Sequence, residues 1–107
     1  MKAQETIIAE LNQVVEKIPQ LQIKYDFDAS DNTHSIEVLP LSFYKNNKDY
    51  ADFEMDFTFR MIKKFPYHFL FFVSDETMHQ IEKPTIIITG KAFVEEDRHE
   101  NLLVLDL

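Results

Sequence analysis

The chain has 107 residues, and 19 Asp and Glu against 11 Lys and Arg give it a formal net charge of −8. This acidity argues against nucleic acid as a partner, because non-specific binding depends on Lys and Arg contacts to phosphates. The absence of cysteine excludes disulfides, thiolate metal sites and a cysteine nucleophile. The one glycine, Gly90, is too few for a P-loop or a GxGxxG turn. The length predicts a single domain over residues 1–107.

The sequence also predicts a cytoplasmic protein that does not enter a membrane. Its longest uninterrupted apolar run, residues 69–73, is far shorter than the roughly 20 residues that span a bilayer. Polar residues interrupt the N-terminal stretch from its start, whereas a signal peptide has a continuous apolar region there.

The N-terminal segment has the spacing of an amphipathic helix. Its apolar residues recur at i, i+1, i+4, i+7, i+8 and i+11, and so form one stripe: Ile7, Ile8, Leu11, Val14, Val15 and Ile18. Pro19 disfavours helical geometry in the residue before it. We therefore predict a helix over residues 3–18 that buries this stripe.

A β-hairpin is expected next. Residues 21–28 alternate between apolar and polar side chains, which is the period of a half-buried strand. Residues 29–33 are expected to form a turn, because the short polar side chains of Ser30, Asp31, Asn32 and Thr33 can hydrogen-bond their own backbone. A second strand over residues 34–39 completes an antiparallel hairpin, and Pro40 ends it because proline has no N–H to donate.

The segment from residue 49 to 65 permits two interpretations. Alternating apolar and polar residues between 51 and 61 are typical of a strand. A helix is favoured by a capping side chain at Asn46 or Asn47, by acidic residues early and basic residues late, and by Pro66 after the segment. These three signals are independent of the alternation, so we prefer the helix.

On the helical interpretation, this segment has an unusual surface. Asp49, Asp52 and Asp56 share one side because they are spaced three and four residues apart. Met55 and Phe59 fall outside the buried apolar stripe and are expected to be exposed, which marks a contact surface. The three carboxylates would form a negative patch for a basic partner.

Three further strands are predicted in the second half of the chain. Residues 68–73 are apolar at nearly every position, which suits a strand buried on both faces. A short helical turn over residues 74–81 separates it from the β-branched strand 85–89. That strand can continue past Gly90, where an isolated glycine marks a bulge or a close backbone approach. Residues 102–105 form the last strand.

These elements predict a two-layer α+β fold. The N-terminal helix and the second helix pack on a mostly antiparallel sheet of about five strands. If residues 50–62 are a strand instead, a single helix packs on a longer β-meander.

No catalytic constellation, metal site or cofactor is expected. The four histidines, His34, His68, His79 and His99, lie on different predicted elements and far apart in the sequence. A zinc site or a histidine base needs several such groups to converge. No serine lies in a Gly-x-Ser-x-Gly elbow.

An aromatic cluster is expected to build the core, with a ligand pocket as the alternative. Its members are Phe53, Phe57, Phe59, Phe65, Tyr67, Phe69, Phe71 and Phe72.

The leading functional hypothesis is a small non-enzymatic protein that binds a protein partner, possessing the size and charge of immunity proteins, antitoxins or secretion chaperones. Its candidate contacts are the acidic residues and exposed apolar residues above, together with the acidic stretch Glu95, Glu96 and Asp97. The alternative is a small-ligand binding domain with an aromatic-lined pocket. A homo-oligomer joined through residues 102–105 or through exposed aromatic residues is a third hypothesis.

Overall fold

The computed structural model describes residues 2–73 and 81–95, and the structural statements below concern these residues. Its elements in chain order are α1 (Ala3–Lys17), β1 (Gln22–Asp28), β2 (Thr33–Leu39), α2 (Leu41–Asn46), α3 (Lys48–Lys64), β3 (Phe69–Val73) and β4 (Ile86–Thr89). The fold is α+β, as predicted.

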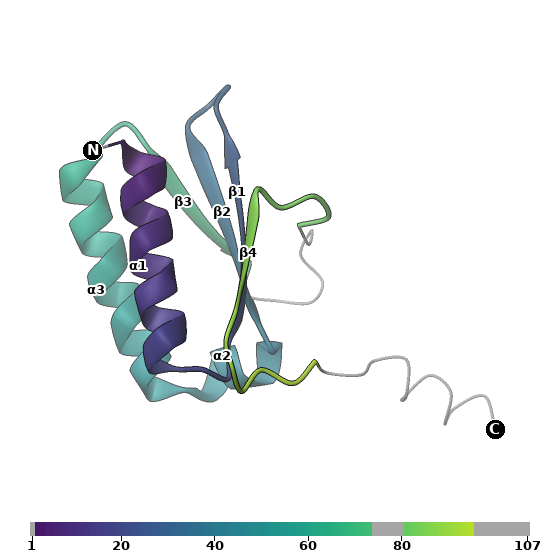
Figure 1. The fold of residues 1–107 in the computed structure, drawn as a ribbon. Coiled ribbons are helices and arrows are strands. Elements are labelled where there is room, and N and C mark those ends of the chain that lie inside the picture. Colours follow the sequence, from purple (N-terminus) through teal and green to yellow (C-terminus); the bar gives the residue numbers. More distant parts are fainter. Residues whose placement is uncertain (1, 74–80, 96–107) are drawn as a thin grey trace.

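The two long helices, α1 and α3, lie side by side on one face of a mixed sheet (Figure 1). The strand order is β3-β2-β1-β4. β1 pairs antiparallel with β2 and with β4, whereas β2 and β3 are parallel because α2 and α3 connect them. The described residues contain four strands, against the five expected. The predicted strand 102–105, and the predicted helical turn 74–81 except for its last residue, lie outside the described residues.

The core lies between the helices and the covered face of the sheet. Alternate residues of the central strands point into it, among them Ile23 and Tyr25 on β1 and Ile36 and Val38 on β2, all fully buried. The apolar stripe of α1 packs on them, as predicted from its spacing. Phe57 of α3 is fully buried among these side chains.

The β1–β2 hairpin follows the turn chemistry expected of its sequence. The Asp28 carboxylate accepts hydrogen bonds from the backbone N–H and the hydroxyl of Ser30, at 2.9 and 2.6 Å. The Asp31 carboxylate accepts from the backbone N–H of Thr33 at 3.1 Å. Asn32 adopts a left-handed conformation, with φ of 57°, which asparagine tolerates better than most residues.

The ambiguous middle segment is the helix α3, so the strand interpretation and the β-meander are wrong. The side chain of Asn47 caps it by accepting a hydrogen bond from the backbone N–H of Tyr50 at 2.8 Å. The helix ends at Lys64, before Pro66. The short helix α2, which follows Pro40, was not predicted.

The expectation that β3 is buried on both faces is wrong. Phe69 is 60% exposed and Phe71 is 44% exposed, because α1 and α3 cover only one face of the sheet and β3 lies at its edge. Tyr67 and Phe59 are also exposed. The aromatic cluster therefore contributes only part of its members to the core.

Gly90 lies where two backbone segments come close together, as predicted from a single glycine within a strand-like sequence. The strand β4 ends one residue earlier, so the expected continuation past Gly90 is wrong. The chain nevertheless stays against the segment that precedes β1: Gly90 N–H donates to Leu21 O at 2.8 Å, and Ala92 N–H donates to Pro19 O at 2.9 Å. A Cβ atom at Gly90 would lie 2.1 Å from Pro19 O.

Candidate functional site

The helix α3 presents three different sides. Tyr50, Phe57 and Met61 are buried against the sheet and α1. A row of carboxylates follows on the next side, and an apolar stripe lies on the side that faces away from the core. We call the carboxylate row and this stripe together the α3 surface; it consists of Asp49, Asp52, Met55, Asp56, Phe59 and Ile62.

The apolar part of the α3 surface is strongly exposed. Met55, Phe59 and Ile62 have 64%, 63% and 55% of their area open to solvent. They are spaced four and three residues apart, so they lie next to one another along the helix. The predicted exposure of Met55 and Phe59 is confirmed, and Ile62 extends the stripe beyond what was expected.

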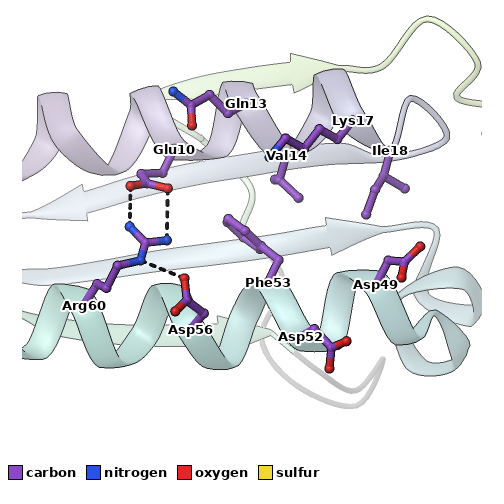
Figure 2. Close-up of a pocket in the computed structure, with 10 residues that line it drawn as sticks. All are labelled: Glu10, Gln13, Val14, Lys17, Ile18, Asp49, Asp52, Phe53, Asp56 and Arg60. Carbon is purple, nitrogen blue, oxygen red and sulfur yellow. Dashed lines mark hydrogen bonds and ion pairs between the residues drawn. The ribbon is translucent and has the colours of Figure 1, made fainter.

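The carboxylate row borders a groove of about 670 Å³ between α1 and α3 (Figure 2). The residues that line it are Glu10, Gln13, Val14, Lys17, Ile18, Asp49, Asp52, Phe53, Asp56 and Arg60. Phe53 projects from α3 toward α1 in the middle of the groove, and Val14 and Ile18 point toward it from α1. The groove therefore has an apolar floor and a charged rim, with four carboxylates against two cationic side chains.

Arg60 joins the two helices at one end of the groove. Its guanidinium donates two hydrogen bonds to the Glu10 carboxylate on α1, at 2.5 and 3.2 Å, and one to Asp56 on its own helix at 2.8 Å (Figure 2). These two carboxylates raise the pKa of Arg60. The pairing of Arg60 with Asp56 follows from their spacing of four residues, whereas the bridge to Glu10 depends on helix packing and was not predicted.

The remaining carboxylates of the row are less neutralised. Asp52 pairs with Lys48 at 3.0 Å, but both side chains are largely exposed, so solvent screens this contact. Asp49 forms no ion pair with any other described residue. The sequence-based grouping of Asp49, Asp52 and Asp56 is confirmed as an arrangement, since all three border one groove.

The second candidate acidic surface is only partly described. Glu95 is exposed, whereas Glu96 and Asp97 lie outside the described residues. Only Glu95 of this stretch can therefore be placed relative to the α3 surface.

Two histidines that lie 34 residues apart in the sequence meet beneath the helices. His34 on β2 is fully buried. Its Nδ1 is 2.7 Å from the hydroxyl of Tyr25, and its Nε2 is 2.8 Å from Nδ1 of His68. Phe27 stacks on the His34 ring with centroids 4.5 Å apart. The expectation that the described histidines stay apart is therefore wrong, and we call Tyr25, His34 and His68 the relay.

Burial and the neighbouring His68 lower the pKa of His34 to about 4. Burial raises the pKa of Tyr25. At neutral pH, His34 is consequently an uncharged imidazole with one N–H, and each of its two nitrogens has a hydrogen-bonding partner. This arrangement satisfies a buried polar group in the core, as a stable fold requires.

The lowered pKa of His34 predicts an acid-sensitive fold. An unfolded histidine titrates near 6.5, so between pH 6.5 and 4 the unfolded chain binds a proton that the folded chain does not. Stability contributed by His34 is therefore present above pH 6.5 and is lost as the pH falls. Between pH 7 and 5 we expect wild-type protein to lose about 2 kcal/mol more stability than His34→Gln, measured by urea unfolding. Equal losses in the two proteins would contradict the assignment.

A half-buried polar group lies between α2 and α3. The Glu54 carboxyl lies beside the hydroxyls of Tyr44 and Tyr50, whose rings are 5.3 Å apart. Burial raises the pKa of Glu54 although both hydroxyls favour its charged form, and it raises the pKa of Tyr44 to about 12. Glu54 Oε1 and the Tyr50 hydroxyl nevertheless have no hydrogen-bond partner among the described residues.

Among the described residues, no three His, Asp or Glu side chains are arranged to hold a metal ion. Within residues 2–73 and 81–95, no helix has both the length and the apolar character that crossing a membrane requires. No protein-family model, curated protein or solved structure matches the chain.

Proposed function

We propose that this protein is a non-enzymatic binding module that recognises a basic protein partner through the α3 surface. The observation that carries the proposal is the adjacency, on one helix, of a carboxylate row and a stripe of large apolar side chains. Each feature alone is common on soluble proteins, but together they supply both the contact area and the charge of a recognition surface.

The apolar stripe supports binding because it differs from an ordinary solvated helix face, which carries polar residues. Met55, Phe59 and Ile62 are each more than half exposed. An apolar patch rimmed by polar groups is typical of an interaction site, and methionine and aromatic residues are enriched at such sites.

The carboxylates indicate the chemistry of the partner. Asp49, Asp52 and Asp56 give the rim of the stripe a negative potential, and the net charge of −8 reinforces it. Such a field accelerates encounter with Lys- and Arg-rich surfaces and disfavours acidic ones. A second copy of this chain fits less well, because a symmetric contact through this surface would bring two carboxylate rows together.

A paired capture experiment tests the proposal. Tagged wild-type protein and Phe59→Ala are used to capture partners from the native cell at low salt, with recovery measured by quantitative mass spectrometry. We expect a stoichiometric basic protein with the wild type and at least a tenfold lower affinity with Phe59→Ala, because truncating an aromatic residue at a binding hot spot typically costs about 2 kcal/mol or more. The double variant Asp49→Lys/Asp52→Lys is expected to bind more weakly and to lose the salt dependence of binding.

Two matched variants control for indirect effects. Phe69→Ala removes an aromatic ring of similar exposure from the open face of the sheet, and Glu82→Lys reverses a charge next to that face. Both are expected to capture the partner as the wild type does. Equal recovery with Phe59→Ala and the wild type would reject the α3 surface, and sedimentation as a dimer that Phe59→Ala abolishes would assign it to a second copy.

A further inference from the structure

The strand β3 forms one edge of the sheet and, among the described residues, pairs with another strand on one side only. At its start, the Phe69 N–H donates to Asn32 O at 2.9 Å, on the side of β2. Successive residues of a strand direct their backbone groups to opposite sides, so Leu70 and Phe72 direct their N–H and C=O groups to the free edge. Within residues 2–73 and 81–95, no backbone group pairs with them there. β3 therefore presents a row of donors and acceptors with which another strand can pair.

The side chains of β3 also favour contact with another strand. Leu70 and Phe72 pack against the core, whereas Phe69 and Phe71 lie exposed on the open face of the sheet. Soluble proteins usually protect an edge strand with a charged residue or a proline, and β3 contains neither. An uncharged edge with exposed aromatic side chains is therefore a site for association with a second chain.

The charge around β3 indicates which chain this is. Residues 65–74 contain no Asp, Glu, Lys or Arg, and no other stretch of the sequence without these residues is as long. The neighbours of Phe69 and Phe71 on β2 are Thr33 and Ser35, which are also uncharged. Two copies that each carry a net charge of −8 repel one another, so they associate most readily where neither contributes a carboxylate. The β3 edge meets this condition, whereas the α3 surface does not.

We propose that β3 pairs with β3 of a second copy, antiparallel about a two-fold axis, so that the two sheets become one continuous sheet. A two-fold contact needs a self-complementary surface. With Leu70 opposite Leu70 of the second copy, the outward N–H and C=O groups of these two residues bond one another. Phe69 of each copy then lies opposite Phe71 of the other. These are non-hydrogen-bonded pairs, in which the side chains approach most closely, so the exposed aromatic rings cover one another.

Sedimentation of the full-length chain tests the proposal. We expect a reversible monomer–dimer equilibrium with a dissociation constant on the order of 100 μM, because the contact is small. The dimer is expected to tighten with added salt, which screens the repulsion between two negative chains. Phe69→Ala is expected to weaken the dimer at least tenfold, because the two-fold symmetry removes the ring from both copies. Ile87→Ala, which truncates an exposed apolar residue at the other edge of the sheet, is expected to leave the dimer unchanged.

Cross-linking tests the register of the contact. Because the chain has no cysteine, introduced cysteines report on the contact without background. An equal mixture of Phe69→Cys and Phe71→Cys is expected to form a disulfide-linked dimer faster than either variant alone, since these positions lie opposite each other and a disulfide requires close Cβ atoms. The mixed dimer also keeps one of its two aromatic pairs.

Four results would overturn the proposal. A monomer at ~1 mM, ten times the expected dissociation constant, would show that the edge does not pair. A dimer that Phe69→Ala leaves intact would place the contact away from β3, and one that Phe59→Ala abolishes would place it on the α3 surface. Cross-linking that is no faster in the mixture than in the single variants would contradict the pairing of Phe69 with Phe71.

Discussion

Truncation of Phe57 to alanine is expected to lower the free energy of unfolding by about 3–5 kcal/mol. The side chain is fully buried between α3 and the sheet. Its ring stacks on Phe53 with centroids 5.2 Å apart and meets the edge of Phe72 at 6.5 Å. Removing the ring loses the free energy that its burial contributes to folding. It also leaves a cavity that the rigid backbones of the helix and the sheet cannot close. Urea unfolding at pH 7 measures the loss.

The matched control for this variant lies two residues further along the same helix. Phe59→Ala deletes the same atoms, but its side chain is 63% exposed, so its stability is expected to change by less than about 0.5 kcal/mol. A large loss for Phe59→Ala, or a small one for Phe57→Ala, would contradict the orientation of α3. The comparison also isolates binding effects, because a folded Phe59→Ala protein that loses its partner has lost a contact and not its structure.

Replacement of the only glycine by alanine is expected to destabilise the fold by about 3 kcal/mol or more. The added Cβ at Gly90 would lie 2.1 Å from the Pro19 carbonyl oxygen and 2.7 Å from the Leu21 carbonyl oxygen. These are backbone atoms that no rotamer change can move, so the chains must separate. Overpacking of this kind costs about 1–3 kcal/mol, and separation also weakens two hydrogen bonds worth about 1 kcal/mol each.

The effect of Gly90→Ala should be local in origin. Lys91→Ala, at an exposed neighbour, is expected to change stability by less than about 0.5 kcal/mol. Amide hydrogen exchange in Gly90→Ala is expected to accelerate first at residue 90 and at Ala92, whose N–H groups donate across this approach. Wild-type stability of Gly90→Ala would show that the two backbone segments are not in contact.

Local signals were sufficient to predict most elements of the fold. Three local signals favoured a helix for α3: a capping asparagine, acidic residues early and basic residues late, and a following proline. They outweighed the alternation of apolar and polar residues, which is typical of a strand. The cap, predicted at Asn46 or Asn47, is at Asn47, and the exposure of Met55 and Phe59 was predicted from their positions outside the apolar stripe of the helix. Such features depend on residues only a few positions apart, which is the range over which a sequence pattern carries direct physical meaning.

Features that depend on packing between distant elements were not predictable in the same way. The exposed Phe69 and Phe71 could not be inferred from an apolar run, because the run does not show which faces of the sheet the helices cover. His34 lies in phase with Ile36 and Val38, so alternation does indicate that it points into the core. Its contact with His68, however, requires the parallel pairing of β2 with β3.

The same distinction applies to the candidate site. The carboxylate row of α3 is a property of one helix and was predicted from spacing. The bridge from Arg60 to Glu10, which closes one end of the groove, joins residues 50 positions apart and depends on how α1 and α3 pack. The carboxylate row of the α3 surface could therefore be predicted from the sequence. The groove beside it could not, because it is formed by the packing of α1 against α3.

The position of β4 in the sheet constrains the order in which the chain can assemble. β1 and β2 are joined by a tight turn, so their hairpin and the covering α1 can form while later residues are still being synthesised. The other edge of β1 is completed only by β4, and the contact between Gln22 and Thr89 spans 67 positions. During that interval β1 presents an unpaired edge, which is a template for association with other chains. The pairing of β1 with β4 is therefore a non-local contact, and contacts between such distant residues form slowly because a long loop must close first.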